Sequence, residues 1–425
     1  MTMPISRRTI LTLLAAGVAG GGVMSMLRML RNPCRDALPP DLAEHPMLLQ
    51  AWSGIEPQRL WDCHAHLAGV GASDSGIVIS ESMQSWLHPL QYAQLTFYLD
   101  ASCVGDDQQR IDQAYIDRLS QLLGQFPPGA KIMLFAFDYP HDEQGRALTG
   151  QSALYVPDAW ALRAAQTSPQ RFEWVCSIHP YRSDAVAALE QAARDGARAV
   201  KWLPAAMGMD PASPLCDPFY EALVRLRLPL IVHCGEEKAV HGVNMSHLGN
   251  PLRLRRPLDH GVRIVVAHCA SIGEDADSDN GGRVVATFDL FSRLMDEPRY
   301  EHLLFGDISA ITLRNRSAQV IRRIIENSHW RRRLLNGSDY PLPAIMPLVS
   351  PTRLHHFGLL PQHAVAMLNR LQEYNPLLFD FVLKRSLRSG DKRLDVDIFH
   401  TRDFFLGDVG ADADDAAQAA KPRRY

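Results

Sequence analysis

Eight short aliphatic runs alternate along the chain with helix-length amphipathic segments, and most of the runs end in a polar residue. This alternation predicts an α/β protein in which helices connect parallel strands. The predicted strands are Arg59–His64, Lys131–Asp138, Phe172–His179, Ala197–Leu203, Leu228–His233, Arg263–His268, Leu303–Ile308 and Arg333–Ser338. The predicted helices between them include Ser183–Asp195, Pro218–Leu226, Arg283–Met295 and Ser317–Asn327.

Eight such repeats favour a (β/α)8 TIM barrel, whose active sites lie at the carboxyl ends of the strands. The alternative is a doubly wound open sheet. That fold would not bring the polar ends of the first, fifth, sixth and eighth strands to one point. The barrel is therefore the preferred fold class.

The connection after the first strand is unusually long and predicts a helical insertion at about residues 68–130, with helical patterns at Leu90–Leu99 and Arg110–Leu123. Loops of this length at the carboxyl face of a barrel are often lids or substrate walls. The full division is a segment 1–31, a linker 32–57, a barrel 58–390 and a C-terminal extension 391–425. The end of that extension is polar and rich in Ala and Asp, which predicts disorder.

The amino-terminal segment places Arg7 and Arg8 before about 19 uncharged residues, Thr9 to Leu27. This pattern resembles a twin-arginine export signal. The alternative is an uncleaved membrane anchor, because the uncharged stretch just reaches the length of a spanning helix. We expect an exported protein, either periplasmic or anchored in the inner membrane and facing the periplasm.

The composition is that of an ordinary globular protein, with 425 residues, 46% of them hydrophobic and 21% charged. The net charge of −3 includes four arginines in the first 31 residues, so the remainder is more acidic still. We therefore expect no nucleic-acid partner, and membrane contact only through the amino-terminal segment. Seven cysteines without a CxxC spacing predict neither a disulfide framework nor a zinc finger.

Metal-competent side chains stand at the ends of four of the predicted strands. They are His64 and His66 on the first strand, His233 on the fifth, His268 on the sixth and Asp339 on the eighth. Residues two apart on a strand share a face, so both histidines of the His-x-His pair can bind one ion. An isolated pair could equally be two ordinary polar residues. Nitrogen and oxygen ligands from separate strands are typical of a catalytic metal site with one position open for water.

The order of these residues resembles the amidohydrolase superfamily, and in particular its amidohydrolase-related branch of metal-dependent barrel hydrolases, which also contains decarboxylases. The resemblance covers about residues 58–390 and includes the motifs Gly196–Pro204 and Asn375–Phe379. It implies that His64, His66 and His233 bind a divalent metal with Asp339 beside them. It also implies that His268 is a second-metal ligand or a catalytic histidine.

These roles agree with metal chemistry. A bound divalent ion lowers the pKa of its water to about 7. Asp339 would take the water's proton and pass it to the leaving group, while the metal and His268 stabilise the oxyanion. His268 has an alternative interpretation as a buried histidine bonded to backbone. Zinc is the expected metal, although imidazole and carboxylate ligands also suit manganese, iron and cobalt.

Lys201, at the end of the fourth predicted strand, leaves two alternatives open. It resembles the carboxylated lysine that bridges two metals in some superfamily members, or it places an ammonium for a substrate carboxylate. One metal is favoured over two. Weaker candidates for substrate contact or ligand orientation are His179, Glu236, Glu237 and Arg253, with Arg255 and Arg256 beside the last.

The predicted function is hydrolysis of a C–N or C–O bond, as in an amide, a lactone or a related ester, by a metal-activated water. One alternative is a metal-dependent decarboxylase of the same branch. Another, from a different class, is a non-catalytic binding protein of the cell envelope. We expect a small-molecule substrate, which Lys201 and Arg253 would suit if it were acidic. The sequence favours no particular oligomeric state.

Overall fold

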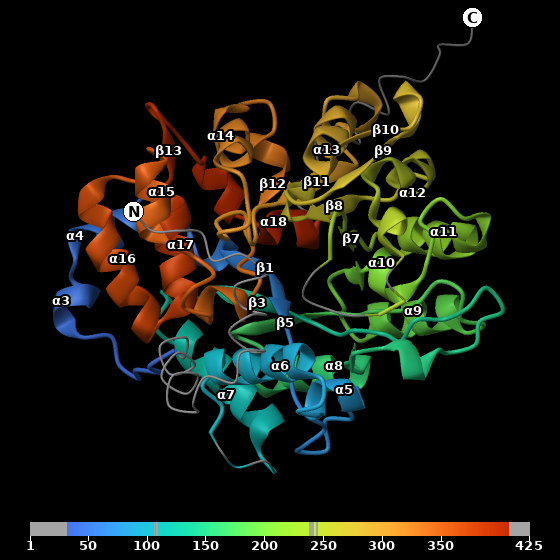
Figure 1. Cartoon of the computed structure of the whole chain (residues 1–425), viewed down its shortest axis with the longest axis horizontal. Helices are drawn as coiled ribbons and strands as arrows, with labels where there is room; N and C mark the ends of the chain where they lie inside the picture. The colour runs from blue at the N-terminus through green and yellow to red at the C-terminus, as the bar shows by residue number, and fades with distance from the viewer. Residues whose placement is uncertain (1–31, 106, 108, 238–241, 244, 408–425) are drawn as a thin grey trace, which may run out of the picture.

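The computed structural model describes residues 32–105, 107, 109–237, 242–243 and 245–407 (Figure 1). The predicted export segment 1–31 and the carboxyl-terminal residues 408–425 lie outside the described residues. Within the described ranges, no helix has both the length and the apolar character needed to cross a membrane.

Eight parallel strands form the centre of the molecule, in two sheets (Figure 1). The first sheet has the order β1-β3-β5, with β1 at Trp61–His66, β3 at Lys131–Phe135 and β5 at Phe172–Val175. The second has the order β12-β11-β8-β7-β6. Its strands are β6 (Val200–Trp202), β7 (Leu230–His233), β8 (Ile264–Ala267), β11 (Leu304–Asp307) and β12 (Leu334–Leu335). Seven of the eight predicted runs contain one of these strands and the first overlaps β1, which confirms the α/β class.

Backbone hydrogen bonds join the two sheets at both pairs of edges. Between β5 and β6, the amide of Cys176 donates to the carbonyl of Ala199 (3.1 Å), and the amide of Lys201 donates to the carbonyl of Cys176 (2.8 Å). Between β12 and β1, the amide of Asp339 donates to the carbonyl of His64 (2.7 Å). Because all eight strands are parallel, their carboxyl ends lie at one end of this arrangement.

A compact inner core lies between the sheets, separate from the main core under the helices. It contains one or two apolar side chains from each strand or from the residue next to it. The set is Trp61, Cys63, Met133, Phe135, Val175, Ala199, Ile231, Val265, Phe305 and Leu335. Alternate strand residues point to opposite faces, so one set fills this interior and the other packs against the helices.

Helices surround the strands on the outside (Figure 1). They include α8 (Asp158–Thr167), α9 (Ala185–Arg194), α11 (Asp217–Leu226), α12 (Arg255–Asp259), α13 (Thr287–Met295) and α14 (Ala318–Glu326). The apolar stripe of α14, formed by Ile321, Ile324 and Ile325, is buried. Such a stripe at helical spacing is what predicted α9, α11, α13 and α14 from the sequence.

One predicted helix is too long. Residues Arg283–Ala286 form strand β10 of an antiparallel hairpin with β9 (Glu274–Asp277), and the helix begins only at Thr287. The β-branched pair Val284 and Val285 favours an extended conformation, which the amphipathic pattern concealed. This part of the prediction was wrong.

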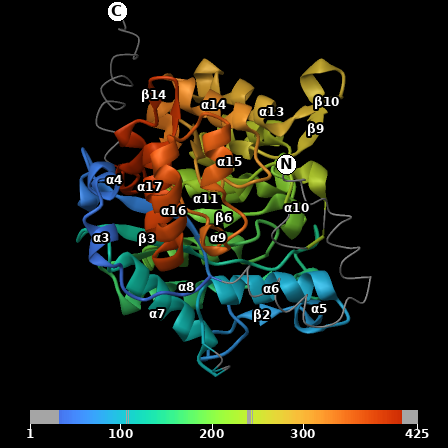
Figure 2. The same ribbon diagram turned by 60° about the vertical axis from the view of Figure 1, so that its left-hand side comes forward.

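The insertion after β1 is helical, as expected from the sequence. It carries β2 (Val78–Ile79), α5 (Glu81–Gln84), α6 (Pro89–Ala101) and α7 (Ile111–Leu123), which lie along one side of the molecule (Figure 2). The hydroxyl of Tyr115 on α7 donates to the carbonyl of His66 (2.6 Å). The insertion therefore contacts the strand that carries the His-x-His pair.

Residues 32–57, which we expected to be a linker, pack on the folded domain. They contain α3 (Pro40–Ala43) and α4 (Pro46–Ala51), whose Leu42 and Leu48 are buried. A disulfide joins Cys34 to Cys103, at the end of α6. The expectation of no disulfide was therefore wrong, because 69 residues separate the two cysteines and only the tertiary fold brings them together.

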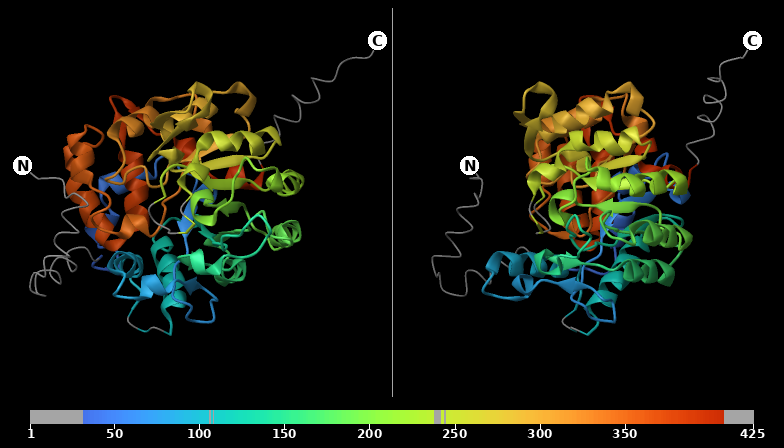
Figure 3. Two further views of the ribbon diagram at one scale, coloured as in Figure 1. Left: turned by 45° about the vertical axis from the view of Figure 1, so that its right-hand side comes forward. Right: turned by 90° about the vertical axis from the view of Figure 1, so that its right-hand side faces the viewer.

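The carboxyl-terminal elements complete two sides of the molecule. Helices α15 (Pro351–His356), α16 (Gln362–Tyr374) and α17 (Pro376–Ser386) lie beside the amino-terminal helices (Figure 3). After the hairpin of β13 (Arg388–Ser389) and β14 (Lys392–Arg393), helix α18 (Arg402–Leu406) reaches the amino ends of the strands. There Phe404 and Phe405 join the inner core. The first part of the predicted extension is therefore folded.

Candidate metal centre

The metal-competent side chains predicted from the sequence meet at the carboxyl ends of the strands. His66 Nε2 lies 3.1 Å from Asp339 Oδ1 and His64 Nε2 lies 3.5 Å from the same oxygen. His268 Nε2 lies 3.7 Å from Asp339 Oδ2. One ligand atom each from His64, His268 and Asp339 falls within 4.8 Å of the others, and all three residues are buried.

Sharp backbone turns at the strand ends direct two of these side chains. His268 follows β8 with φ of 57°, and Asp339 follows β12 with φ of 62°. Left-handed conformations at non-glycine residues cost about 1–3 kcal/mol and persist only where the surroundings hold them. Here the amide of His268 donates to Asp307 Oδ1 (2.9 Å) and the amide of Asp339 donates to the carbonyl of His64. Each turn is thus fixed by a neighbouring strand.

The structure adds Asp307, at the end of β11, which the sequence analysis missed. Asp307 Oδ2 lies 2.8 Å from His64 Nδ1, and Oδ1 accepts hydrogen bonds from the amide and hydroxyl of Ser309. Burial acts to raise the pKa of Asp307, but its interaction with His64, including the hydrogen bond at Nδ1, holds it well below the usual range. The available signal was the polar pair Asp307 and Ser309 at the end of the seventh predicted strand.

Hydrogen bonding fixes which nitrogen of each ring carries the proton. Since the Asp307 carboxylate can only accept, His64 Nδ1 donates to it. His268 Nδ1 faces the carbonyl (3.2 Å) and the hydroxyl oxygen (2.7 Å) of Ser309, whose hydroxyl hydrogen is engaged by Asp307. His268 Nδ1 therefore also donates. In both neutral rings, Nε2 presents a lone pair towards the Asp339 carboxylate.

The electrostatics keep the imidazoles neutral and the carboxylate charged. Burial lowers the pKa of His64 to about 4 and that of His268 well below its ordinary value. Burial acts to raise the pKa of Asp339, yet His268 and His66 hold it well below the usual range. Two imidazole lone pairs that face one carboxylate form a negative site that attracts a cation, and the Lys201 ammonium, with Nζ 3.4 Å from His64 Nε2, meets only part of this demand. The donor set fits a divalent metal.

His233, at the end of β7, has a further unpaired nitrogen. Its Nδ1 lies 3.3 Å from Glu237 Oε2, whereas its buried Nε2 has no hydrogen-bond partner among the described residues. Its ring lies 5.3 Å from the ring of His268, and burial lowers its pKa. A buried nitrogen held this way is suited to a metal, with Glu237 orienting the ring as the sequence suggested.

A protein-family model described as an amidohydrolase matches residues 61–345, which is more than half of the chain. The chain belongs to the amidohydrolase family. The resemblance inferred from the order of the ligands is thereby confirmed. No curated protein matched the chain.

Solved structures similar to this chain are distant. A TIM-barrel protein from Bordetella bronchiseptica is 15% identical, with 74% of this chain and 99% of that chain covered and a TM-score of 0.44. A probable 2-pyrone-4,6-dicarboxylic acid hydrolase from Acinetobacter baumannii, with citric acid bound, is 12% identical over 74% and 92%, with a TM-score of 0.41. A 5-carboxyvanillate decarboxylase from Novosphingobium aromaticivorans, with bound manganese, is 12% identical over 82% and 98%, with a TM-score of 0.43.

Lys201 on β6 faces the same centre. Its side chain is buried, with Nζ 3.4 Å from His64 Nε2 and 5.1 Å from the centre of the Phe135 ring. Burial lowers its pKa, against the attraction of Asp307 and Asp339. This position suits either predicted role, the bridge between two metals or the ammonium for a substrate carboxylate.

The weaker candidates have other partners in the structure. Both ring nitrogens of buried His179 bond to backbone, Nε2 to the carbonyl of Met207 (3.1 Å) and Nδ1 to the amide of Tyr181 (3.2 Å). Burial lowers the pKa of His179 to about 3. This arrangement favours a structural role for His179 over contact with a substrate.

The arginines proposed for substrate recognition are paired with carboxylates of the protein. Arg253 forms an ion pair with Asp210 (2.7 Å). Arg255 pairs with Asp279 and Arg256 with Asp217, both at 2.6 Å. Glu236 is exposed, and its amide donates to the carbonyl of Ile272. None of these contacts points to a substrate.

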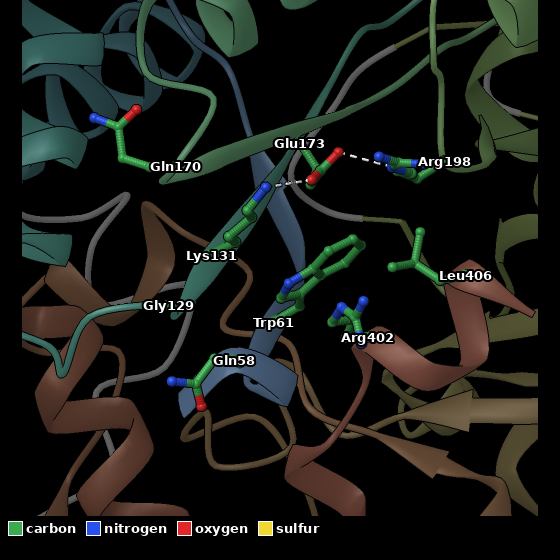
Figure 4. A pocket seen from close by; sticks show the side chains of 9 residues that line it. All are labelled: Gln58, Trp61, Gly129, Lys131, Gln170, Glu173, Arg198, Arg402 and Leu406. Carbon is green, nitrogen blue, oxygen red and sulfur yellow. Dashed lines mark hydrogen bonds and ion pairs between the residues drawn. The ribbon is translucent and has the colours of Figure 1, made fainter. Parts of the chain in front are cut away.

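A cavity of about 420 Å³ lies at the opposite ends of the strands (Figure 4). Trp61 and Lys131, the first residues of β1 and β3, line it together with Glu173 and Arg198. Glu173 Oε1 accepts from Lys131 (2.6 Å) and Oε2 from Arg198 (2.7 Å). Since no member of the histidine and aspartate cluster lines this cavity, it is distinct from the candidate metal centre.

Proposed function

We propose that the chain is a metal-dependent hydrolase of a C–N or C–O bond, as in an amide, a lactone or a related ester. The observation that carries the proposal is the convergence of the His64 and His268 lone pairs on the Asp339 carboxylate. We also interpret the two sheets as one (β/α)8 barrel. Their bonded edges and their shared inner core support that interpretation.

His64, His66, His233 and Asp339 would hold the metal, and we favour a single zinc ion. When bound, such an ion supplies a water with a pKa of about 7 and polarises a carbonyl oxygen. Asp307 orients His64 through its Nδ1, and Glu237 orients His233 in the same way. These contacts keep the Nε2 atoms directed into the centre.

The chain's own groups account for the proton transfers. The Asp339 carboxylate accepts the proton of the attacking water and delivers it to the leaving nitrogen or oxygen. His268 Nε2 has a lone pair, so it serves as a ligand of a second ion or as a proton acceptor. Stabilising the substrate oxygen that gains negative charge would require a proton on Nε2, which the lowered pKa of His268 disfavours. Ser309 holds its ring at Nδ1 in either case.

Elemental mass spectrometry of the purified full chain tests this proposal. Loss of about one metal per chain in a His64→Ala, His66→Ala double variant would support it. A double variant of two exposed histidines, His302→Ala with His329→Ala, is the matched control and should keep its metal. No bound metal after reconstitution with zinc or manganese would contradict the proposal and favour the non-catalytic binding protein. Two metals would favour Lys201 as a carboxylated bridge.

A metal-dependent decarboxylase is the second candidate, because the buried Lys201 ammonium beside the centre suits a substrate carboxylate. The two reactions differ in their products. Incubation in ¹⁸O-water with aromatic acids, lactones and amides separates them. Carbon dioxide release without ¹⁸O in the other product indicates decarboxylation, and ¹⁸O in a new carboxylate indicates hydrolysis.

We further propose that the protein is exported. The Cys34–Cys103 disulfide supports this, because disulfides persist mainly in oxidising compartments. Fusing residues 1–31 to a reporter that is active only outside the cytoplasm tests the proposal. Reporter activity that survives Arg7→Lys with Arg8→Lys would contradict a twin-arginine signal.

A further inference from the structure

Arg316 is a buried arginine whose side chain has no hydrogen-bond or ion-pair partner among the described residues. It lies in the loop between β11 and α14, and only 6% of its surface is exposed. Within the described part of the chain, its Nε has no hydrogen-bond partner and its guanidinium takes part in no ion pair. Arginine is almost never fully buried unless it is paired, because removing its charge from water costs several kcal/mol.

Two other arginines with an unbonded buried Nε, Arg118 and Arg255, differ from Arg316 in this respect. Arg118 also has an unbonded Nε, but its terminal nitrogens donate to Gln121 Oε1 (2.8 Å) and to the carbonyl of Tyr374 (3.4 Å). The terminal nitrogens of Arg255 likewise donate to the carboxylate of Asp279. Of these three arginines, only Arg316 has a guanidinium with no hydrogen-bond acceptor among the described residues.

The loop that carries Arg316 is held in place by its backbone. Leu313 forms an antiparallel bridge with Val349, and the amide of Arg316 donates to the carbonyl of Leu313 (2.9 Å). The guanidinium of Arg353 donates to the carbonyl of Arg316 (3.3 Å). Because these contacts fix the backbone, a guanidinium without a partner is not explained by a loosely placed loop.

The charge of Arg316 acts on the candidate metal centre. The loop follows the carboxyl end of β11, the same end of the strands at which His268 and Asp339 lie. Burial lowers the pKa of Arg316 to about 10, against the attraction of Asp339, Glu237 and Glu236. The same charge helps to lower the pKa of His233. Arg316 stays protonated at neutral pH and its field reaches the predicted ligands.

We propose that Arg316 is the receptor for a carboxylate of the substrate, so that the preferred substrates are anionic acids. This inference rests on the proposed function, because it places the carboxylate in the same centre as the bond that is cleaved. A planar guanidinium binds a carboxylate through two parallel hydrogen bonds, which adds orientation to charge. A substrate carboxylate would thus supply the hydrogen-bond acceptor that the described residues do not offer to Arg316.

Isothermal titration calorimetry with benzoate and the neutral, nearly isosteric benzamide tests this assignment on the zinc-loaded full chain. Wild-type protein should bind benzoate at least about ten-fold more tightly than benzamide. Arg316→Gln should weaken benzoate binding by about ten-fold or more and leave benzamide binding unchanged. Arg316→Lys, which keeps the charge and loses the planar fork, should fall between the two. The variant comparison separates the contribution of Arg316 from direct binding of benzoate to zinc.

Arg314→Gln is the matched control. It removes the same charge from an exposed position of the same loop, two residues away, and should leave the affinity for benzoate unchanged. An Arg316→Gln protein that binds benzoate as tightly as the wild type overturns the proposal. An equal loss in Arg314→Gln also overturns it, since the effect would then be one of general charge.

Metal content and melting temperature, measured on each variant, distinguish failure of this inference from failure of the proposed function. A chain without metal contradicts the metalloenzyme. The same titrations on chelator-treated protein then still test Arg316. If Arg316→Gln does not fold, the proposal is tested instead by the ratio of benzoate to benzamide affinity in the wild type and by the titration of Arg316→Lys. A ratio near one in the wild type overturns the proposal.

Discussion

The two ends of the eight strands differ in whether their buried charged groups have partners within the protein. At the amino ends, Glu173 accepts hydrogen bonds from both Lys131 and Arg198, and both of these cations lie over the ring of Trp61 at 5.6 and 5.8 Å (Figure 4). At the carboxyl ends, the lone pairs of two histidines face the Asp339 carboxylate, and Arg316 has no partner among the described residues. At the amino ends, the charges of Lys131 and Arg198 are thus neutralised by Glu173. At the other end, the proposed metal and the proposed substrate carboxylate would supply the missing partners.

This difference indicates where stability and function lie on the same strands. Parallel strands place every carboxyl end on one side, where loops can vary without disturbing the sheet. Uncompensated buried groups lower stability, so their concentration at one end favours a functional explanation. Paired charges around the amino-end cavity favour a structural one. The following substitutions test this contrast, beginning with the largest expected effect.

Replacing Asp339 by Asn should reduce kcat/KM by about a thousand-fold, because the amide cannot accept the proton of the attacking water. The measurement is steady-state hydrolysis of whichever lactone or amide the wild type accepts. Asp289→Asn, at a half-exposed surface ion pair with Arg323, is the control and should retain full activity. Activity within about ten-fold of the wild type in Asp339→Asn would place the proton acceptor elsewhere.

Replacing Asp307 by Ala should weaken metal binding by about 10- to 100-fold, since His64 would lose the acceptor that fixes its tautomer. Competition with a chromogenic chelator measures the affinity. Asp403→Ala, at the amino-end ion pair with Arg59, is the control and should leave the affinity unchanged. Equal metal affinity in the Asp307 variant and the wild type would remove this residue from the centre.

Acidification should destabilise the metal-free protein, because buried histidines at the carboxyl ends of the strands resist protonation. In the unfolded chain, histidine takes up a proton near pH 6.5, whereas burial lowers the pKa of folded His64 to about 4 and that of His179 to about 3. The unfolded state therefore binds more protons below pH 6.5, and stability is lost as the pH falls from 6.5 towards 4. The loss should amount to a few kcal/mol, on the order expected for two such shifts.

Urea unfolding at several pH values measures this loss. Two variants that remove one of the buried imidazoles, His64→Gln and His179→Gln, should each make the pH dependence shallower. His302→Gln, at an exposed position, should not. An unchanged slope in both buried variants would refute the assignment of neutral imidazoles.

Replacing Glu173 by Gln should lower the free energy of unfolding by about 1–3 kcal/mol, because Lys131 and Arg198 lose their shared partner in a mostly buried site. Metal affinity should not change. Glu190→Gln breaks a more exposed pair with Arg225 and should cost less than about 0.5 kcal/mol. A metal affinity that falls in Glu173→Gln would show that the two ends of the strands are coupled.

The strands and the order of the candidate ligands followed from the sequence. Most of the strands are short aliphatic runs with polar residues at or just beyond their ends, so His64, His233 and His268 could be placed from local pattern. The supporting residues could not. Asp307 has a partner 243 residues away, and Arg316 is distinguished only by the absence of a partner among the described residues, which no local pattern records.

Local periodicity therefore determined the α/β class, the eight strands and the set of metal-competent side chains, because hydrophobic spacing reflects which face of an element is buried. The tertiary structure alone decided the Cys34–Cys103 pairing, the hairpin at Arg283–Ala286 and the packing of residues 32–57. It also decided which buried charged side chains have oppositely charged partners within the protein. Such properties depend on contacts between segments distant in sequence, whose energies are set only when the chain has folded.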